Sequence, residues 1–270
     1  MLTRIISAVV GIILLGYIIN TGSWVFYVGI SFLNICAIYE LHKALKKKDI
    51  HITVFLSSAF AVVLLYFVNF SYKFNFILVY LFIILMLMLE FLYSIINNNR
   101  NHLIDAVFSV FSFIYTSLLF MCIVLVRNLP NGINLTWWVF VITWACDTGA
   151  FFTGIFLGKK PLAPNISPKK TVEGSLGGVL SSVVVSVIFA VYLLPEIKTI
   201  QAIILGILIG FVSQVGDLSA SLIKRYCKIK DFSNIIPGHG GILDRLDSAL
   251  FSFPVAYIFI KILFQKGGLL

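Results

Sequence analysis

Charged side chains are scarce in this sequence. Only 11% of its 270 residues are Asp, Glu, Lys or Arg, whereas about 25% is usual in a soluble domain. Hydrophobic residues make up 60% of the chain. A transmembrane helix needs about 20 mostly apolar residues, and the chain has room for many such segments and little else. The composition excludes an ordinary soluble enzyme and predicts one membrane domain over residues 1–270.

Cysteine is also rare, and the spacing of the four residues excludes several kinds of site. Cys36, Cys122, Cys146 and Cys227 form no C-x-x-C pair, and three of them fall in apolar segments. We therefore predict ordinary small apolar side chains rather than a metal or redox motif. The amino-terminal apolar run lacks a convincing small-x-small cleavage site, which favours a retained first helix over a signal peptide.

Long apolar stretches predict an all-α membrane protein with about nine transmembrane helices. The stretches are 4–20, 23–42, 52–70, 74–97, 103–127, 134–157, 175–194, 199–226 and 246–265. Only short breakers separate them, and no linker is long enough to divide domains. We expect residues 1–130 to be mainly scaffold and residues 134–250 to form the catalytic part.

The net charge of +9 comes from basic residues that cluster after every second predicted helix. These are Lys43, Lys46, Lys47 and Lys48, then Arg100, then Lys159, Lys160, Lys169 and Lys170, and finally Lys224, Arg225, Lys228 and Lys230. The positive-inside rule then places the N-terminus and these loops in the cytoplasm. Such clusters suit lipid head groups or phosphates, and we expect no nucleic-acid partner.

Two features precede the most charged segment. Asp147 lies late in an apolar helix, where a carboxylate is costly unless it is paired or solvated, so it is a functional candidate. The segment 158–174, GKKPLAPNISPKKTVEG, is too polar and too rich in proline to span the membrane. It reads either as a positive-inside loop or as a phosphate-binding loop containing Lys169 and Lys170. Thr171 could cap the next helix, with Glu173 in its first turn.

Gly154 and Gly158 form a GxxxG pair, for which close helix packing is the favoured interpretation.

Residues 216–247 concentrate charge as no other stretch does. This stretch carries nine charged side chains in 32 residues: Asp217, Lys224, Arg225, Lys228, Lys230, Asp231, Asp244, Arg245 and Asp247. If the preceding helix continues, Asp217, Ser221, Lys224 and Lys228 share one face, with Arg225 alongside. The run PGHGG must be a loop, and Gly240 and Gly241 could bring backbone N–H groups close to an anion. Asp244 and Asp247 follow at i, i+3.

Carboxylates beside basic groups suit nucleotidyl transfer. Mg²⁺ binds through carboxylates and phosphate oxygens, and it neutralises charge as pyrophosphate leaves. We therefore predict a Mg²⁺ site at Asp217, Asp244 and Asp247, which could also hold a second cation. Lys and Arg would bind the remaining phosphate oxygens.

The same stretch resembles the signature of the phosphatidate cytidylyltransferases, the CDP-diglyceride synthases. The signature S-x-x-K-R-x4-K-D-x-S-x3-P-x-H-G-G-x2-D-R-x-D is filled at every fixed position. The upstream DTGAFF and SPKKTVEG are also similar to that family, so the resemblance covers about 134–250. Val172, where an aromatic residue is expected, and Ile155, where a basic residue is common, depart from the pattern.

The resemblance implies that CTP and phosphatidate give CDP-diacylglycerol and pyrophosphate with Mg²⁺, in phospholipid biosynthesis. It implies catalytic roles for Asp217, Lys224, Asp244 and Asp247. The substrate-binding residues would be Asp147, Lys169, Lys170, Thr171, Glu173, Ser221, Arg225, Lys230, His239, Gly240, Gly241 and Arg245. We favour binding over base catalysis for His239, since phosphatidate is already an anion at neutral pH.

The expected setting is a bacterial inner membrane, with the site facing the cytoplasm among membrane lipids; an endomembrane is the alternative. GxxxG and the resemblance favour a homodimer.

The sequence leaves other functions open. One alternative to the phosphatidate enzyme is a CTP-dependent transferase acting on another lipid phosphate, isoprenoid or ether-linked. Another is an ion-coupled transporter using Asp147 and Asp217, against which the absence of a sequence repeat counts. The D-G-x-x-A-R pattern of the CDP-alcohol phosphotransferases is absent.

Overall fold

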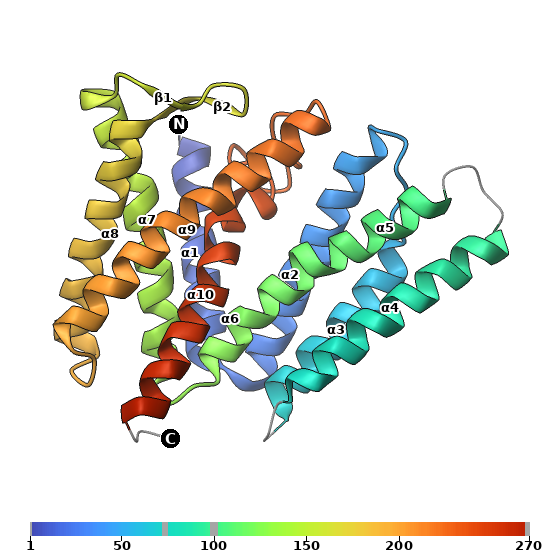
Figure 1. The fold of residues 1–270 in the computed structure, drawn as a ribbon, viewed down its shortest axis with the longest axis horizontal. Coiled ribbons are helices and arrows are strands. Elements are labelled where there is room, and N and C mark those ends of the chain that lie inside the picture. Colours follow the sequence, from blue (N-terminus) through green and yellow to red (C-terminus); the bar gives the residue numbers. More distant parts are fainter. Residues whose placement is uncertain (1, 72–74, 98–101, 268–270) are drawn as a thin grey trace. The chain divides into compact units, whose positions relative to one another are not determined.

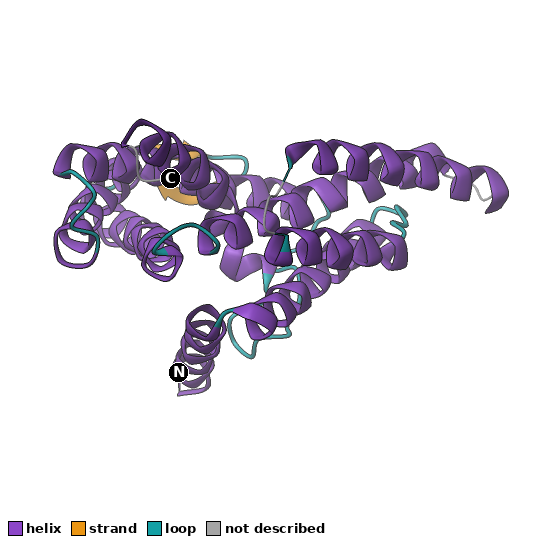
Figure 2. Cartoon of the chain, turned by 90° about the horizontal axis from the view of Figure 1, so that it is seen from below, coloured by secondary structure: helices purple, strands orange, loops and turns teal. Residues whose placement is uncertain are grey.

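The computed structural model describes residues 2–71, 75–97 and 102–267, with side chains described over 6–71, 75–97 and 103–263 (Figure 1). Arg100, which was used above to orient the helices, lies outside these residues. Helices make up nearly all of the described chain, and the only strands within it are one short pair (Figure 2). The predicted all-α class is confirmed.

The helices have the length and composition of membrane spans. Seven helices in the described chain are long and apolar enough to cross a bilayer, and two shorter apolar helices cover Ile6–Thr21 and Val54–Phe70. Large apolar side chains such as Ile13, Ile77 and Phe211 are exposed on them. Because a water-facing surface rarely carries so much apolar area, lipid is the solvent that fits, and the chain is an integral membrane protein. The number of crossings and the side of the N-terminus stay predictions.

The chain divides into two compact units. Unit 1 contains the residues up to Leu125 together with Tyr226–Arg245, and unit 2 contains Val126–Arg225 together with the residues from Leu246 onward. The central part of the charged segment therefore belongs with the amino-terminal helices. The predicted division into scaffold and catalytic parts stays a prediction.

Unit 1 is a set of long helices with polar side chains buried between them. Its elements are α1 (Leu2–Thr21), α2 (Ser23–Lys46), α3 (Val54–Phe70), α4 (Phe76–Asn97), α5 (His102–Phe113), the π-helix η1 (Ile114–Leu118) and most of α6 (Leu119–Arg127). The rings of Trp24 and Phe70 pack together between α2 and α3. The buried Ser117 Oγ in η1 donates to Asn34 Oδ1 in α2 (3.4 Å).

Unit 2 is held together by small residues. Its elements are α7 (Gly132–Leu157), β1 (Pro161–Ala163), β2 (Ser167–Thr171), α8 (Val172–Leu193), α9 (Thr199–Tyr226, except its last residue) and α10 (Leu243–Gly267, from Leu246 onward). Ser182 Oγ in α8 donates to the carbonyl oxygen of Gly206 in α9 (2.7 Å). Trp138 Nε1 in α7 donates to the carbonyl oxygen of Ser186 (3.0 Å). Contacts this short between helices require small side chains.

The packing role predicted for the GxxxG pair is confirmed. A Cβ on Gly154 would lie 3.3 Å from Thr171 Oγ1 and 3.8 Å from the Cα of Gly174. A Cβ on Gly158 would lie 2.7 Å from the same hydroxyl oxygen. The end of α7 therefore lies directly against the start of α8, and a larger side chain would force them apart.

The polar loop after α7 forms a β-hairpin. Strands β1 and β2 pair antiparallel, with Pro161 opposite Thr171 and Ala163 opposite Ser167. Figure 1 shows the hairpin at the end of α7 and α8 where the two helices are joined. The sequence predicts correctly that this segment is not helical, but strands of three and five residues are too short for a period of two to be visible.

Candidate active site

The start of α8 fixes the hairpin. Thr171 is the N-cap of α8, and its Oγ1 accepts a hydrogen bond from the backbone N–H of Gly174 (3.1 Å), as predicted. Oε2 of Glu173 accepts from the backbone N–H groups of Lys159 and Lys160 (2.9 and 3.2 Å). Both side chains thus accept hydrogen bonds from backbone N–H groups, and these bonds set the position of β2 and its two lysines.

An ion pair joins the hairpin to α9. Lys170 Nζ in β2 lies 2.5 Å from Asp217 Oδ2, and both side chains are partly exposed. The hydroxyl of Ser221, one turn further along α9, is 3.5 Å from Asp217 Oδ1. The predicted shared face of Asp217 and Ser221 is therefore present, and Lys170 comes to it from a motif 47 residues earlier in the sequence. The prediction is wrong for Lys228, because α9 ends at Tyr226 and Lys228 has a left-handed φ of 54°.

Two further carboxylates of unit 2 lie near this pair. A Cβ on Gly216 would be 2.5 Å from the carbonyl oxygen of Asp247, so α9 and α10 touch at this level. The side chain of Asp247 interacts electrostatically with Asp217, Asp147 and Lys224. Ser248 Oγ donates to Asp147 Oδ1 (3.3 Å). Unit 2 therefore gathers three carboxylates and at least two ammonium groups.

Arg225 has a structural contact in the same unit. Its Nε donates to the carbonyl oxygen of Ile166, in the turn between β1 and β2 (3.1 Å). The guanidinium still has four N–H donors for an anion. Lys169 lies on the exposed side of β2.

Residues 227–242, between α9 and α10, form a loop that we call the signature loop. Its chain is held by Asp244 in the first turn of α10, which is nearly buried. Oδ2 of Asp244 accepts from the backbone N–H groups of Phe232 (2.8 Å) and Gly241 (3.0 Å). Gly240 has φ +86°, and a Cβ there would be 2.9 Å from the same oxygen. The backbone N–H of Gly241, which the sequence predicts to lie close to an anion, thus donates to the carboxylate of Asp244 in this structure.

Sequence reasoning misses two side chains that hold the signature loop. Glu40 in α2 is fully buried, and its carboxylate accepts hydrogen bonds from Ser233 and from the backbone at the start of α10. Ser7 in α1 contacts the carbonyl oxygen of Pro237 (3.1 Å) and Nδ1 of His239 (2.8 Å). Glu40 carries the signal that singled out Asp147, a lone carboxylate late in an apolar run.

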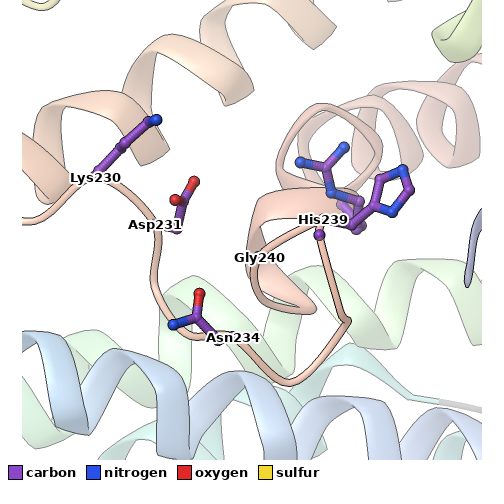
Figure 3. Close-up of a pocket in the computed structure, with 7 residues that line it drawn as sticks. Lys230, Asp231, Asn234, His239 and Gly240 are labelled. Carbon is purple, nitrogen blue, oxygen red and sulfur yellow. The ribbon is translucent and has the colours of Figure 1, made fainter. Parts of the chain in front are cut away.

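The signature loop and the first turn of α10 line a half-open polar cavity of about 320 Å³. It is lined by Lys230, Asp231, Asn234, Gly238, His239, Gly240 and Arg245. Figure 3 shows Lys230, Asp231 and Asn234 along one arm of the loop, opposite His239 and Gly240 on the other. Lys230 and Arg245 outnumber the one carboxylate, Asp231, so the cavity carries a net positive charge that, with the imidazole of His239, favours an anion.

The structure thus distributes the predicted residues over both units. Unit 2 holds Asp147, Lys169, Lys170, Thr171, Glu173, Asp217, Ser221, Lys224, Arg225 and Asp247. Unit 1 holds Lys230, His239, Gly240, Gly241, Asp244 and Arg245. Across the described residues, no three His, Cys, Asp or Glu side chains are placed as a ready-made metal site. The three-carboxylate Mg²⁺ site and the substrate-binding roles stay predictions.

Comparison with known proteins covers nearly the whole chain. Residues 2–263 match the model of the cytidylyltransferase family. The chain is 31% identical over 261 residues to the phosphatidate cytidylyltransferase of Bacillus subtilis (strain 168), covering 96% of this chain and 97% of that protein.

Two other relatives of the same name match over shorter stretches. The protein of Synechocystis sp. is 48% identical over 137 residues, which are 51% of this chain and 46% of that protein. That of Staphylococcus saprophyticus subsp. saprophyticus is 37% identical over 168 residues, 62% of this chain and 64% of that protein. The match thus spans about half the length of the Synechocystis relative. Since the family model and the Bacillus relative both extend over almost all of the chain, the protein belongs to the cytidylyltransferase family and is a nucleotidyltransferase.

Proposed function

We propose that the protein is a phosphatidate cytidylyltransferase, which converts CTP and phosphatidate into CDP-diacylglycerol and pyrophosphate in phospholipid biosynthesis. The observation that carries the proposal is the ion pair of Lys170 with Asp217. It brings the SPKKTVEG motif and the charged face of α9 together in a membrane protein of this family. The names of the relatives supply the lipid substrate.

The residues of unit 2 fit a Mg²⁺ ion. Asp217, Asp247 and Asp147 offer oxygen ligands, which Mg²⁺ prefers. Asp217 and Asp147 both repel the buried carboxylate of Asp247, so a divalent cation bound among them would stabilise the group beside Lys224 and Lys170. Bound there, Mg²⁺ would neutralise charge on the triphosphate. The role of Asp244 as a further ligand stays a prediction, since its Oδ2 holds the signature loop in unit 1.

The basic residues then act as phosphate ligands. Lys169, Lys170 and Lys224 would bind phosphate oxygens, and Arg225 would do so with the N–H groups that do not hold the hairpin. The phosphate of phosphatidate attacks the α-phosphorus of CTP, the bond to the β-phosphate oxygen breaks, and pyrophosphate leaves. Because the attacking oxygen is already anionic, no protein group needs to take its proton.

The loop cavity would hold part of CTP. Lys230 and Arg245 would bind its phosphates, and His239, positioned by Ser7, would bind rather than act as a base. The acyl chains of phosphatidate stay in the bilayer, so we place the reaction at the cytoplasmic face of a bacterial inner membrane. Gly154 and Gly158 pack against the start of α8 within the same chain, so a homodimer is supported only by the resemblance.

The test is label transfer. Purified protein in detergent receives phosphatidate, CTP labelled at the α-phosphate, and Mg²⁺, and the lipid phase is then counted. We expect label in the lipid with wild type, none with EDTA, and recovery when Mg²⁺ is added in excess. Asp247→Asn should lose most of the activity. Glu196→Gln is the matched control, because this exposed acid of unit 2 only contacts Asn131.

Each outcome bears on a different reading. Label that appears in an isoprenoid or ether-linked lipid phosphate but not in phosphatidate would replace the lipid substrate and keep the reaction. No label in any lipid phosphate, from folded protein that binds no CTP, would overturn the proposal. Uptake of Na⁺ or H⁺ into liposomes would then support the transporter.

A further inference from the structure

Glu40 lies in the part of the chain predicted to be scaffold, yet its carboxylate is directed entirely at the signature loop. Its side chain is 0% exposed. Oε1 accepts from Ser233 Oγ (2.6 Å) and from the backbone N–H of Ile242 (2.9 Å). Oε2 accepts from the backbone N–H of Leu243 (2.8 Å). All these residues belong to unit 1.

The position of this carboxylate explains the local backbone. The first N–H groups of a helix have no partner within the helix, and the helix dipole favours a negative charge there. Glu40 supplies both a partner and a charge at the start of α10. A Cβ on Gly241 would lie 2.5 Å from Oε1 and 2.6 Å from Oε2 of Glu40. Gly241 is therefore required because Glu40 approaches so closely.

The same loop carries the side chains of the polar cavity. Lys230, Asp231 and Asn234 flank Ser233, and His239 and Gly240 precede the backbone that Glu40 binds. Ser233 lies on one arm of the loop and Ile242 on the other, so one carboxylate ties the two arms together. Asp244 Oδ2 makes a second tie between the same arms, so loss of the Glu40 tie should loosen the spacing of the cavity residues rather than abolish it.

We propose that Glu40 is a positioning residue that holds the cavity of the signature loop in the shape that binds the nucleotide. The nucleotide itself rests on the proposed function, whereas the tie between the two arms does not. Glu40 touches no substrate in this proposal. It acts through Ser233 and through the first turn of α10.

Glu40→Gln is the sharpest variant. Glutamine has nearly the same shape, but one carboxylate oxygen becomes an NH₂ donor. All three partners of Glu40 donate, so at least one donor would face another donor. Hydrogen bonds to a charged group are stronger than neutral ones, and a lost buried partner leaves its donor unsatisfied.

Unit 1 offers a matched control in Glu90. It is also a buried glutamate, 1% exposed, in the apolar helix α4. Its Oε2 accepts from Thr53 Oγ1 (3.0 Å), far along the chain from the signature loop. Glu90→Gln replaces a buried carboxyl group without touching the loop, so it reports what the loss of a buried glutamate side chain does to the fold.

The first measurement is steady-state kinetics of label transfer with CTP and phosphatidate varied separately. For Glu40→Gln we expect KM for CTP to rise on the order of tenfold, KM for phosphatidate to stay within about twofold, and kcat to change less than KM for CTP. Glu90→Gln should leave both KM values near wild type. Equal changes in both variants, or an equal loss of kcat with unchanged KM, would overturn the positioning role.

The second measurement does not depend on the reaction. Hydrogen exchange of residues 230–243 is followed by mass spectrometry in wild type and both variants. We expect faster exchange in this segment for Glu40→Gln only. If wild type transfers no cytidylyl group but the exchange result holds, the proposed function fails and the tie stands. Unchanged exchange would overturn the tie whatever the activity.

Ser233→Ala serves if Glu40→Gln does not fold. It keeps the carboxylate and its two backbone partners. It removes the bond from Ser233 Oγ to Glu40, and with it the acceptor that this hydroxyl offers to the backbone N–H of Ile235 (3.3 Å). We expect a rise in KM for CTP of the same kind but smaller, about threefold, and faster exchange near residue 233. A Ser233→Ala enzyme identical to wild type in both measurements would overturn the proposal.

Discussion

The two units use their carboxylates in different ways. In unit 1, Glu40 and Asp244 are nearly or fully buried, and between them they accept four hydrogen bonds from backbone N–H groups. In unit 2, Glu173 and Asp247 also accept from backbone N–H groups, but Asp217 and Asp147 contact side chains, namely Lys170, Ser221 and Ser248, and they are partly or fully exposed. A carboxylate bound to backbone is committed to the fold. One that faces mobile side chains can exchange its partner for a cation or a substrate.

The largest effect is expected when one acid is deleted in each unit. Asp217→Ala should lower kcat/KM on the order of 10³-fold, because it removes a predicted metal ligand and the partner of Lys170. Its thermal unfolding midpoint should stay near wild type. Asp244→Ala should lower the unfolding free energy by about 3 kcal/mol, because two buried N–H groups lose their acceptor. A stable Asp244→Ala protein beside an unfolded Asp217→Ala protein would reverse the comparison.

The two lysines of β2 sharpen the comparison within unit 2, because only Lys170 pairs with Asp217. Lys170→Met should lower kcat/KM about 100-fold, because the charge that lies between Asp217 and the predicted phosphates is lost. Lys169→Met is the matched control on the exposed side of the strand, where a loss of only a few-fold is expected. Label-transfer kinetics decide between them. Equal losses would mean that the hairpin contributes only its net positive charge.

The helix cap of α8 tests a polar side chain of unit 2 that is committed to backbone. Thr171→Val keeps the shape but removes the acceptor for the N–H of Gly174, so stability should fall by about 1 kcal/mol. Thr171→Ser, which keeps the hydroxyl, should remain near wild type. Thermal unfolding in detergent measures both. No difference between the two variants would show that the cap contributes little.

The smallest effect concerns Cys227, which begins the signature loop and is buried. Burial raises the pKa of its thiol, although Lys48 and Lys47 act in the opposite direction. The thiol should therefore stay protonated at neutral pH and react slowly with iodoacetamide, with the rate rising only above the ordinary thiol range. The same protein unfolded in detergent is the control. Rapid labelling of the folded protein at pH 7 would show that the loop opens readily.

The helices could be predicted because their signal is simple. Each run of apolar residues became a helix, and most boundaries shifted by only a few residues. The π-helix Ile114–Leu118 could not be predicted, because its polar residues pack against α2 and no sequence pattern marks that contact. The start of α10 at Leu243 rather than 246 follows from Glu40, which caps it from a distant helix.

The site was predictable only where its residues stand close together in sequence. Asp217 and Ser221 lie one turn apart, and helical spacing is enough to place them together. Lys170 and Asp217 are brought together by packing of small residues in α7, α8 and α9, which spacing does not reveal. The sequence predicts that Gly241 lets the backbone approach a bound anion. In the structure, the group that approaches Gly241 closely is the carboxylate of Glu40.

The distance in sequence between Glu40 and its partners has a consequence for membrane insertion. Ser233, Ile242 and Leu243 follow it by 193, 202 and 203 residues. The nascent α2 therefore enters the bilayer with a carboxylate whose partners have not yet been synthesised, and such a group costs several kcal/mol in an apolar setting. Unit 1 can only mature after the ribosome has passed residue 243. A nascent chain stopped before Ser233 should remain a substrate for membrane quality control, even though all its amino-terminal helices are complete.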